Sequence, residues 1–284
     1  MGDEQRKRNH WLASYPKSGN TWVRMFLSAY HRGGELDINR VTHSCGDMLE
    51  YWYQVVAPRA VADMDLADYL LLRPAALLHL TTVQLGDPLV VKTHNANVMV
   101  DRCQLQPPQL TVNAIYVVRD PRDVVISWAE HLDYGIDETI GKMADTQFLI
   151  RQDRSLPHIL STWSQHVTSW TVEASWPTLV VKYEDMVDAP EKTFRSVLRA
   201  LGFAVDEDRL RAAIAATGFE KLRKREEEEG FAERRHQERF FGRGTHGHWR
   251  TMLTEAQVAQ IERDHGAVMR RLGYTLTTEA AEAA

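Results

Sequence analysis

The sequence predicts one α/β domain in which a central parallel β-sheet is flanked by helices. Four short apolar runs lack the polar alternation of half-exposed strands, which is typical of buried parallel strands: His10–Tyr15, Leu89–Lys92, Ala114–Val118 and Leu179–Lys182. Segments with helical apolar spacing follow or separate these runs. We find no internal repeat and no linker rich in Pro, Gly or Ser. Residues 1–284 are therefore assigned to a single domain, with a structured core from about 10 to 272.

Helical spacing begins at Thr21, directly after the turn signals Pro16 and Gly19. Further helices are predicted over Leu66–Leu72, Pro74–Leu80, Pro121–Leu132, Ile159–Glu173, Pro190–Leu201, Glu207–Ala216 and Glu255–Leu272. Residues 221–239 are dense in charge, which indicates a solvated helix or a mobile loop that could serve as a lid over ligands. We expect residues 277–284 to form a disordered tail.

Composition excludes several classes of protein. The 284 residues are 44% hydrophobic, which rules out collagen, coiled coil and wholesale disorder. Lysines and arginines number 34 against 39 acids, so the net charge of −5 is too mild to draw the whole molecule to nucleic acid. Cys45 and Cys103 fit no zinc or disulfide pattern, and no stretch of about 18 apolar residues exists. We expect a cytoplasmic protein without a membrane span or a bound metal.

The first motif is Tyr15–Trp22, with the sequence YPKSGNTW, where a strand passes into a helix. A helix N-terminus offers free N–H groups and a positive dipole end, Gly19 permits close backbone approach, and Lys17 adds a charge. The motif predicts a phosphate-binding loop. It is not a Walker A loop, because the lysine precedes the only glycine. A glycine turn capped by Ser18 is the structural alternative.

The second motif, Arg119–Ser127, also lies where a strand runs into a helix. A cation at the strand end and a hydroxyl on the helix can converge on one anion. Read alone, Arg119 and Asp120 could instead form a structural ion pair, with Pro121 opening the helix.

The third motif is Val91–His94, at the end of a predicted strand. Ligands of open α/β sheets gather at the carboxyl ends of the strands, so Lys92 and His94 are well placed for chemistry. A histidine is the natural group to take a proton from a hydroxyl near neutral pH.

The fourth motif, Phe241–Arg250, carries closely spaced glycines around Arg243. Glycines permit a backbone nest for phosphate oxygens, and the arginine supplies charge. His246 and His248 lack a third ligand in register, so a metal site is only weakly indicated.

Together these segments resemble the sulfotransferases that use 3'-phosphoadenosine 5'-phosphosulfate (PAPS). The first motif is similar to the family's YPKSGTTW phosphosulfate loop, with Asn20 in place of a threonine. Arg119 and Ser127 have the spacing of the 3'-phosphate motif, Lys92–His94 matches KTH, and the fourth motif is similar to RKGxxGDWK. In that last motif Gly242 stands where a basic residue is usual and His248 where an acid is usual. Tyr183 begins a YED segment like the family's.

The resemblance implies a role for each matched residue. The catalytic residues would be His94 as general base, with Lys17 and Lys92 stabilising the transferring group. The cofactor-binding residues would be Lys17, Ser18, Gly19, Asn20, Thr21, Trp22, Arg119, Ser127, Tyr183, Thr217, Phe219, Arg243 and Gly244. The implied activity is transfer of a sulfuryl group from PAPS to a hydroxyl or amine of a small-molecule acceptor, without a metal.

Two other functions remain open at this point. A P-loop nucleotide kinase would share the fold class but would need a Walker lysine, and a non-catalytic nucleotide-binding protein would not need Lys92 and His94. The acceptor is not specified, although Tyr51, Trp52, Tyr53, Trp128, His131 and Tyr134 suggest an aromatic pocket for an aromatic compound or a natural product. A homodimer is possible, but residues 250–259 depart from the family's dimerisation pattern.

Overall fold

The computed structural model describes residues 8–83, 88–151, 156–234 and 239–277. The strands are β1 (Asn9–Ser14), β2 (Cys45–Gly46), β3 (Leu89–Thr93), β4 (Met99–Val100), β5 (Cys103–Gln104), β6 (Thr111–Val118), β7 (Leu149–Ile150), β8 (His158–Ile159) and β9 (Thr178–Lys182). The α-helices are α1 (Asn20–His31), α2 (Glu50–Val56), α3 (Leu66–Val83), α4 (Pro121–Leu132), α5 (Ile136–Met143), α6 (Trp163–Thr171), α7 (Tyr183–Asp188), α8 (Pro190–Ala200), α9 (Glu207–Ala216), α10 (Phe219–Glu229), α11 (Trp249–Met252) and α12 (Glu255–Arg271). Short 3₁₀ turns are η1 (Val61–Asp63) and η2 (Pro108–Leu110).

Five of the described strands form a parallel sheet in the order β2-β3-β1-β6-β9. The four predicted sheet strands are confirmed as β1, β3, β6 and β9. The sequence reading missed β2 and the two-stranded pairs β4-β5 and β7-β8, because strands of two residues leave no periodic signal.

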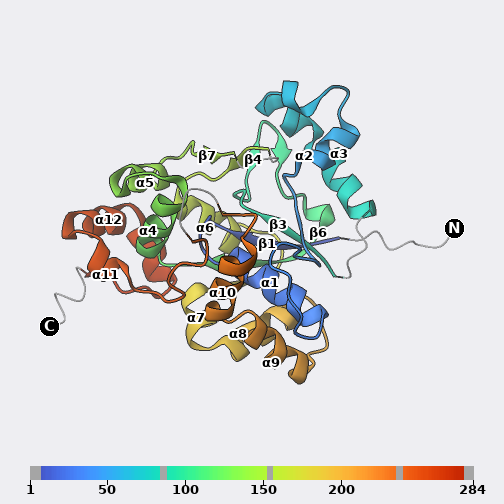
Figure 1. The fold of residues 1–284 in the computed structure, drawn as a ribbon. Coiled ribbons are helices and arrows are strands. Elements are labelled where there is room, and N and C mark those ends of the chain that lie inside the picture. The colour runs from blue at the N-terminus through green and yellow to red at the C-terminus, as the bar shows by residue number, and fades with distance from the viewer. Residues whose placement is uncertain (1–7, 84–87, 152–155, 235–238, 278–284) are drawn as a thin grey trace.

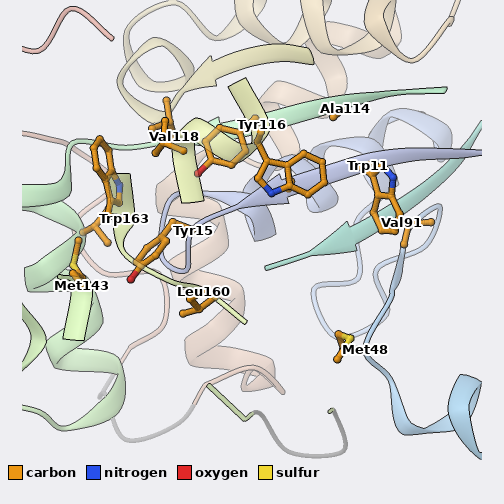
Figure 2. Packing of buried hydrophobic residues seen from close by; sticks show 14 of the residues in the cluster. Trp11, Tyr15, Met48, Val91, Ala114, Tyr116, Val118, Met143, Leu160 and Trp163 are labelled. Atoms are coloured by element: carbon orange, nitrogen blue, oxygen red, sulfur yellow. The ribbon is translucent and has the colours of Figure 1, made fainter. Parts of the chain in front are cut away.

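Helices cover both faces of the sheet (Figure 1). Side chains of β1 alternate between the faces, so Trp11 and Ala13 pack in a core with α3, α4, α6 and α12, while Leu12 packs in a second core with α1, α8 and α9. Figure 2 shows the first core, in which Trp11 beside Val91, Tyr116 of β6 and Trp163 of α6 are buried along one face of the sheet. The flanked parallel sheet predicted from the sequence is confirmed.

The predicted helices need correction in two places. The separate helices Leu66–Leu72 and Pro74–Leu80 form the single helix α3, which continues through Pro74. A proline removes one helical hydrogen bond, but buried residues on both sides of it, including Tyr69 and Leu77, hold the two halves in line.

Helix α6 begins at Trp163 rather than at Ile159, because Ile159 belongs to β8 and the Thr162 side chain caps the helix by accepting from Gln165 N. The charged segment 221–239 is helical only to Glu229, where Gly230 takes a positive φ of 69°. Residues 235–238 of this segment, and residues 278–284 of the expected tail, lie outside the described residues.

The place of β1 determines where ligands can bind. The chain passes from β1 to β3 on one side and later to β6 on the other, so the sheet order reverses at β1. Crevices form at the carboxyl ends of strands at such a point. The segments that follow β1, β3, β6 and β9 carry the four residues Lys17, His94, Arg119 and Tyr183.

Candidate active site

A cavity of about 680 Å³ opens at the carboxyl ends of β1, β3, β6 and β9. The sequence-predicted site residues that line it are Lys17, Gly19, Asn20, Thr21, Trp22, Lys92, His94, Arg119, Ser127, Tyr183, Phe219, Arg243 and Gly244. Ser18 and Thr217 do not line it. Residues distant in the sequence are thus gathered around one space.

The loop between β1 and α1 is built to receive an anion. Gly19, at the start of α1, has a φ of 109°, and a Cβ there would lie 2.8 Å from the Met186 side chain. Only glycine fits this position without strain. The buried hydroxyl of Ser18 has no hydrogen-bond partner among the described residues. A helix N-terminus beside an unsatisfied donor suits a phosphate group.

Two lysines bring charge to the same place. Burial, and then the nearby Arg119, lower the pKa of Lys17 to about 8. Burial, and then Arg24, lower the pKa of Lys92 to about 8. The Lys17 ammonium also lies 4.2 Å from the centre of the Phe240 ring. Crowded, poorly solvated cations of this kind bind an anion strongly.

Asn20, the residue that departs from the usual loop sequence, turns toward β1. Its amide nitrogen donates to Leu12 O at 3.1 Å and to Ser14 Oγ at 3.3 Å. Its side chain therefore ties the start of α1 to the strand that precedes the loop.

His94 is buried at the cavity wall with a defined tautomer. Its Nδ1 lies 2.8 Å from Ser14 O. A carbonyl only accepts, so Nδ1 carries the proton and Nε2 is left with a lone pair. Burial first, and then the charge of Lys92, hold the pKa of His94 well below its ordinary value. The imidazole is therefore neutral near pH 7 and able to take a proton.

Arg119, at the end of β6, lies across the loop from Lys17. Its Nη1 is 3.5 Å from Lys17 O, and its guanidinium carbon lies 4.3 Å from the centre of the Tyr183 ring. Its Nε has no partner among the described residues. Ser127 lines the cavity two turns into α4. Arg119 is thus stacked on an aromatic ring with a donor left over for a ligand.

The glycine-rich segment near the C-terminus packs against α4 and α10. Asp123 accepts from Gly247 N at 2.6 Å and from Trp249 N at 3.0 Å. Gly244 has a positive φ, and a Cβ there would overlap the Phe219 ring. Arg243 lines the cavity but pairs with Glu130 at 2.8 Å.

Trp22 and Thr217, two further predicted cofactor contacts, lie in different surroundings. Trp22 packs edge-on against Tyr183, with ring centres 5.9 Å apart. Thr217 is fully buried, and its hydroxyl donates to Ala213 O at 2.8 Å. This hydroxyl caps the end of α9 rather than facing the cavity.

Glu233 is a cavity residue that the sequence did not single out. Its carboxylate accepts from Thr21 Oγ1 at 3.0 Å and from Arg24 Nη1 at 2.8 Å. Burial raises the pKa of this carboxyl most strongly, but Arg24, Lys92 and the hydrogen bond from Thr21 together outweigh burial, and the pKa lies below its ordinary value. An anionic side chain thus occupies donors at the start of α1. One acid within a run of charged residues gives no sequence signal for such a contact.

The predicted aromatic pocket is formed only in part. Trp52, Trp128 and His131 line the cavity, whereas Tyr51 is 64% exposed and Tyr53 is buried against Arg73. Leu49, Ile150 and Phe240 add an apolar wall. The cavity wall thus combines cationic groups suited to phosphate with apolar side chains.

This arrangement defines an α/β protein that binds a polyanionic ligand beside a neutral histidine. A sequence model described as the sulfotransferase domain matches residues 7–273. The chain therefore belongs to the sulfotransferase family, and it is a PAPS-dependent enzyme. The family resemblance drawn from the motifs is confirmed, against the kinase and the non-catalytic alternatives.

The individual relatives share little sequence identity with this chain, but each match extends over most of both proteins. Sulfotransferase 1A1 of Mus musculus is 24% identical over 93% of this chain and 85% of its own. Sulfotransferase 1 family member D1 of Mus musculus is 23% identical over 92% of this chain and 83% of its own. The crystal structure of retinol dehydratase with retinol and PAP has a TM-score of 0.63 at 20% identity, over 93% of this chain and 82% of that one. Mouse sulfotransferase SULT7A1 with PAP has a TM-score of 0.59 at 17% identity, over 93% and 86%.

Two further properties concern the described part of the chain. None of its helices is long and apolar enough to cross a membrane. Within the same ranges, no three His, Cys, Asp or Glu side chains gather closely enough to hold a metal ion.

We predict that binding of PAP, the desulfated product, weakens as the pH rises above 8. Lys17 and Lys92, each with a pKa of about 8, then lose the protons that attract the anion. The association constant should fall by up to about tenfold per pH unit for each lysine that contacts the ligand. Titration calorimetry from pH 6.5 to 9.5 measures this, with Lys17→Gln expected to flatten the curve. Affinity that stays constant to pH 9.5 would contradict the assignment.

We also predict that Glu233→Gln tightens PAP binding at least about fivefold, which is roughly 1 kcal/mol. The substitution removes a carboxylate that competes with the ligand for Thr21 and Arg24. Glu229→Gln is the matched control, because Glu229 pairs with Arg225 on the surface of the same segment. Equal PAP dissociation constants for the two variants, measured by calorimetry, would show that Glu233 does not compete.

Proposed function

We propose that His94 is the general base and that the Tyr15–Trp22 loop holds the 5'-phosphosulfate end of PAPS. The observation that carries the proposal is the neutral, buried imidazole of His94 in one cavity with Lys17 and Lys92. PAPS, when bound, supplies the sulfuryl group and leaves as PAP. The residues present suit such a group, because Lys17 and Gly19 of the loop line the cavity and Arg119 Nε is a donor without a partner among the described residues.

Each residue has a separate task in this proposal. His94 Nε2 takes the proton of the acceptor hydroxyl while the new oxygen–sulfur bond forms and the bond to the 5'-phosphate breaks. Lys17 and Lys92 offset negative charge on the sulfuryl and phosphate oxygens. Arg119 and Ser127 would hold the 3'-phosphate, with Arg243 available once it leaves Glu130. Fixed cations and orientation dominate catalysis of such loose transfer reactions.

The acceptor is proposed to be a small, largely apolar alcohol or phenol. Trp52, Trp128, Leu49 and Ile150 give the cavity an apolar part of its wall. The retinol dehydratase structures contain androsterone and retinol, which are apolar molecules with one hydroxyl. An amine acceptor would use the same base.

Thermal unfolding tests the cofactor assignment. PAP at about 100 times its dissociation constant should stabilise the fold by about 2.7 kcal/mol. ADP should shift the midpoint less, because it lacks the 3'-phosphate that Arg119 and Ser127 would hold. A shift with ATP and magnesium alone would contradict the proposal.

His94→Ala tests the base. We predict a loss of roughly 10²–10⁴ in turnover, which is the usual contribution of a general base, together with an unchanged dissociation constant for PAP. His265→Ala is the matched control, since His265 is a buried histidine on α12 that bonds Ser164 and does not line the cavity. Transfer of label from PAPS to a panel of phenols and alcohols provides the assay. Wild-type turnover by His94→Ala would refute the base assignment.

A further inference from the structure

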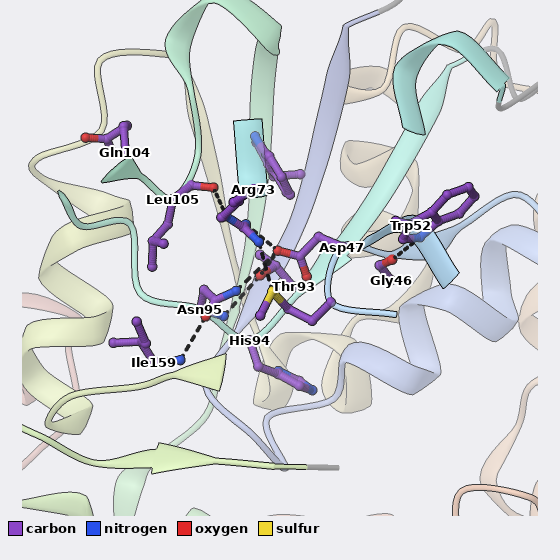
Figure 3. Close-up of polar contacts among 12 residues, drawn as sticks. Gly46, Asp47, Trp52, Arg73, Thr93, His94, Asn95, Gln104, Leu105 and Ile159 are labelled. Atoms are coloured by element: carbon purple, nitrogen blue, oxygen red, sulfur yellow. Dashed lines mark hydrogen bonds and ion pairs between the residues drawn. The ribbon is translucent and has the colours of Figure 1, made fainter. Parts of the chain in front are cut away.

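A buried polar cluster lies behind the strand end that carries His94 (Figure 3). Its centre is the ion pair between Asp47 Oδ2 and Arg73 Nη2, 2.6 Å apart, with side chains 0% and 2% exposed. Neither residue lines the cavity. Asp47 follows β2, and Arg73 lies within α3.

Asp47 binds the residues on both sides of His94. Its Oδ2 accepts from Thr93 Oγ1 at 2.9 Å and from Asn95 Nδ2 at 3.3 Å. Its backbone N–H donates to Lys92 O at 3.1 Å. Lys92 and His94 line the cavity, and Thr93 and Asn95 do not. The Asp47 carboxylate therefore fixes Thr93 and Asn95. These two residues alternate along the chain with Lys92 and His94, the catalytic candidates that line the cavity.

Arg73 in turn fixes the position of the Asp47 carboxylate. Its Nε donates to Leu105 O at 2.7 Å and its Nη1 to Tyr53 Oη at 2.9 Å. Each arm of the guanidinium is thus bonded to a different part of the chain. A buried ion pair is weak evidence for stability, because apolar side chains often serve as well. We therefore explain the Asp47–Arg73 ion pair by the geometry that it imposes on neighbouring residues, and not by a gain in stability.

The segment is also held on its other side. Asn95 Oδ1 accepts from Ile159 N at 2.8 Å, and Asn95 O accepts from Trp170 Nε1 at 2.9 Å. His94 O lies 3.1 Å from His166 Nε2. His94 thus lines the cavity, while its backbone is fixed by neighbours.

We propose that Asp47, oriented by Arg73, is a positioning residue for His94. By holding Thr93 and Asn95, it sets the backbone so that His94 Nδ1 meets Ser14 O and Nε2 remains the basic nitrogen. This inference rests on the proposed function of His94. It adds a buried set of residues, Asp47, Arg73 and Thr93, that acts on the reaction without touching either substrate.

Thr93→Val tests the inference with little change in volume. It removes the bond to Asp47 and the bond that Thr93 Oγ1 accepts from Asn95 N at 3.0 Å. We expect kcat to fall at least tenfold, with an unchanged KM for PAPS and an unchanged PAP dissociation constant.

Thr111→Val is the matched control. Thr111 is likewise a buried strand threonine that makes two hydrogen bonds, donating to Pro107 O at 2.8 Å and accepting from Trp11 Nε1 at 2.9 Å. It lies at the opposite end of the sheet, at the start of β6. It should lose comparable thermal stability and keep its kcat.

A second readout does not depend on turnover. Nitrogen-15 NMR of the imidazoles should show a single Nδ1–H tautomer for His94 in the wild type, assigned by its absence in His94→Gln. Thr93→Val should give a mixture of tautomers, and Thr111→Val should not. Asp47→Asn retains an acceptor oxygen for Thr93 and should keep more of the single tautomer than Asp47→Ala.

The outcomes are separable. A Thr93→Val enzyme that matches Thr111→Val in both kcat and tautomer would overturn the positioning role, even if Asp47→Ala fails to fold. A wild-type enzyme that transfers nothing from PAPS would refute the proposed function, while the NMR comparison would still decide whether Thr93 and Asp47 orient His94.

Discussion

β1 hydrogen-bonds in parallel to β3 on one side and to β6 on the other, and this central place decides which loops can meet. Ser14, its last residue, accepts from His94 through its backbone carbonyl. The loop that follows begins the anion site, and Arg119 reaches that loop from β6. A strand at the edge of the sheet could join only one of these neighbours to the loop.

The meeting of these strand ends and loops also brings several cations close together. Lys17, Lys92, Arg24 and Arg119 share one cavity, and their mutual repulsion is relieved only by anions. Glu233 supplies one carboxylate from the chain itself. Burial, helped by the charge of Lys92, keeps His94 neutral, so one of the cations that attract the ligand also helps to keep the histidine in its basic form.

Sequence reasoning located the parts of the site that are contiguous in the chain. The loop at Tyr15–Trp22 and the residues Lys92 and His94 could be predicted because glycine, charge and strand ends signal them locally. The contacts of Glu233 and Asp47 could not, because each depends on tertiary neighbours that are distant in sequence. The predicted helix break at Pro74 is wrong for the same reason. Local propensity predicts a break, whereas packing on both sides of the proline maintains the helix.

Asn20 connects the exchange of one loop residue to the surroundings of the catalytic histidine candidate. Its amide bonds the Ser14 hydroxyl, which lies 3.3 Å from the imidazole of His94. A threonine at position 20 is shorter and carries no amide, so it would offer Ser14 a different partner. The side chains at positions 14 and 20 therefore depend on each other, so that an exchange at either position changes the hydrogen bonds beside His94.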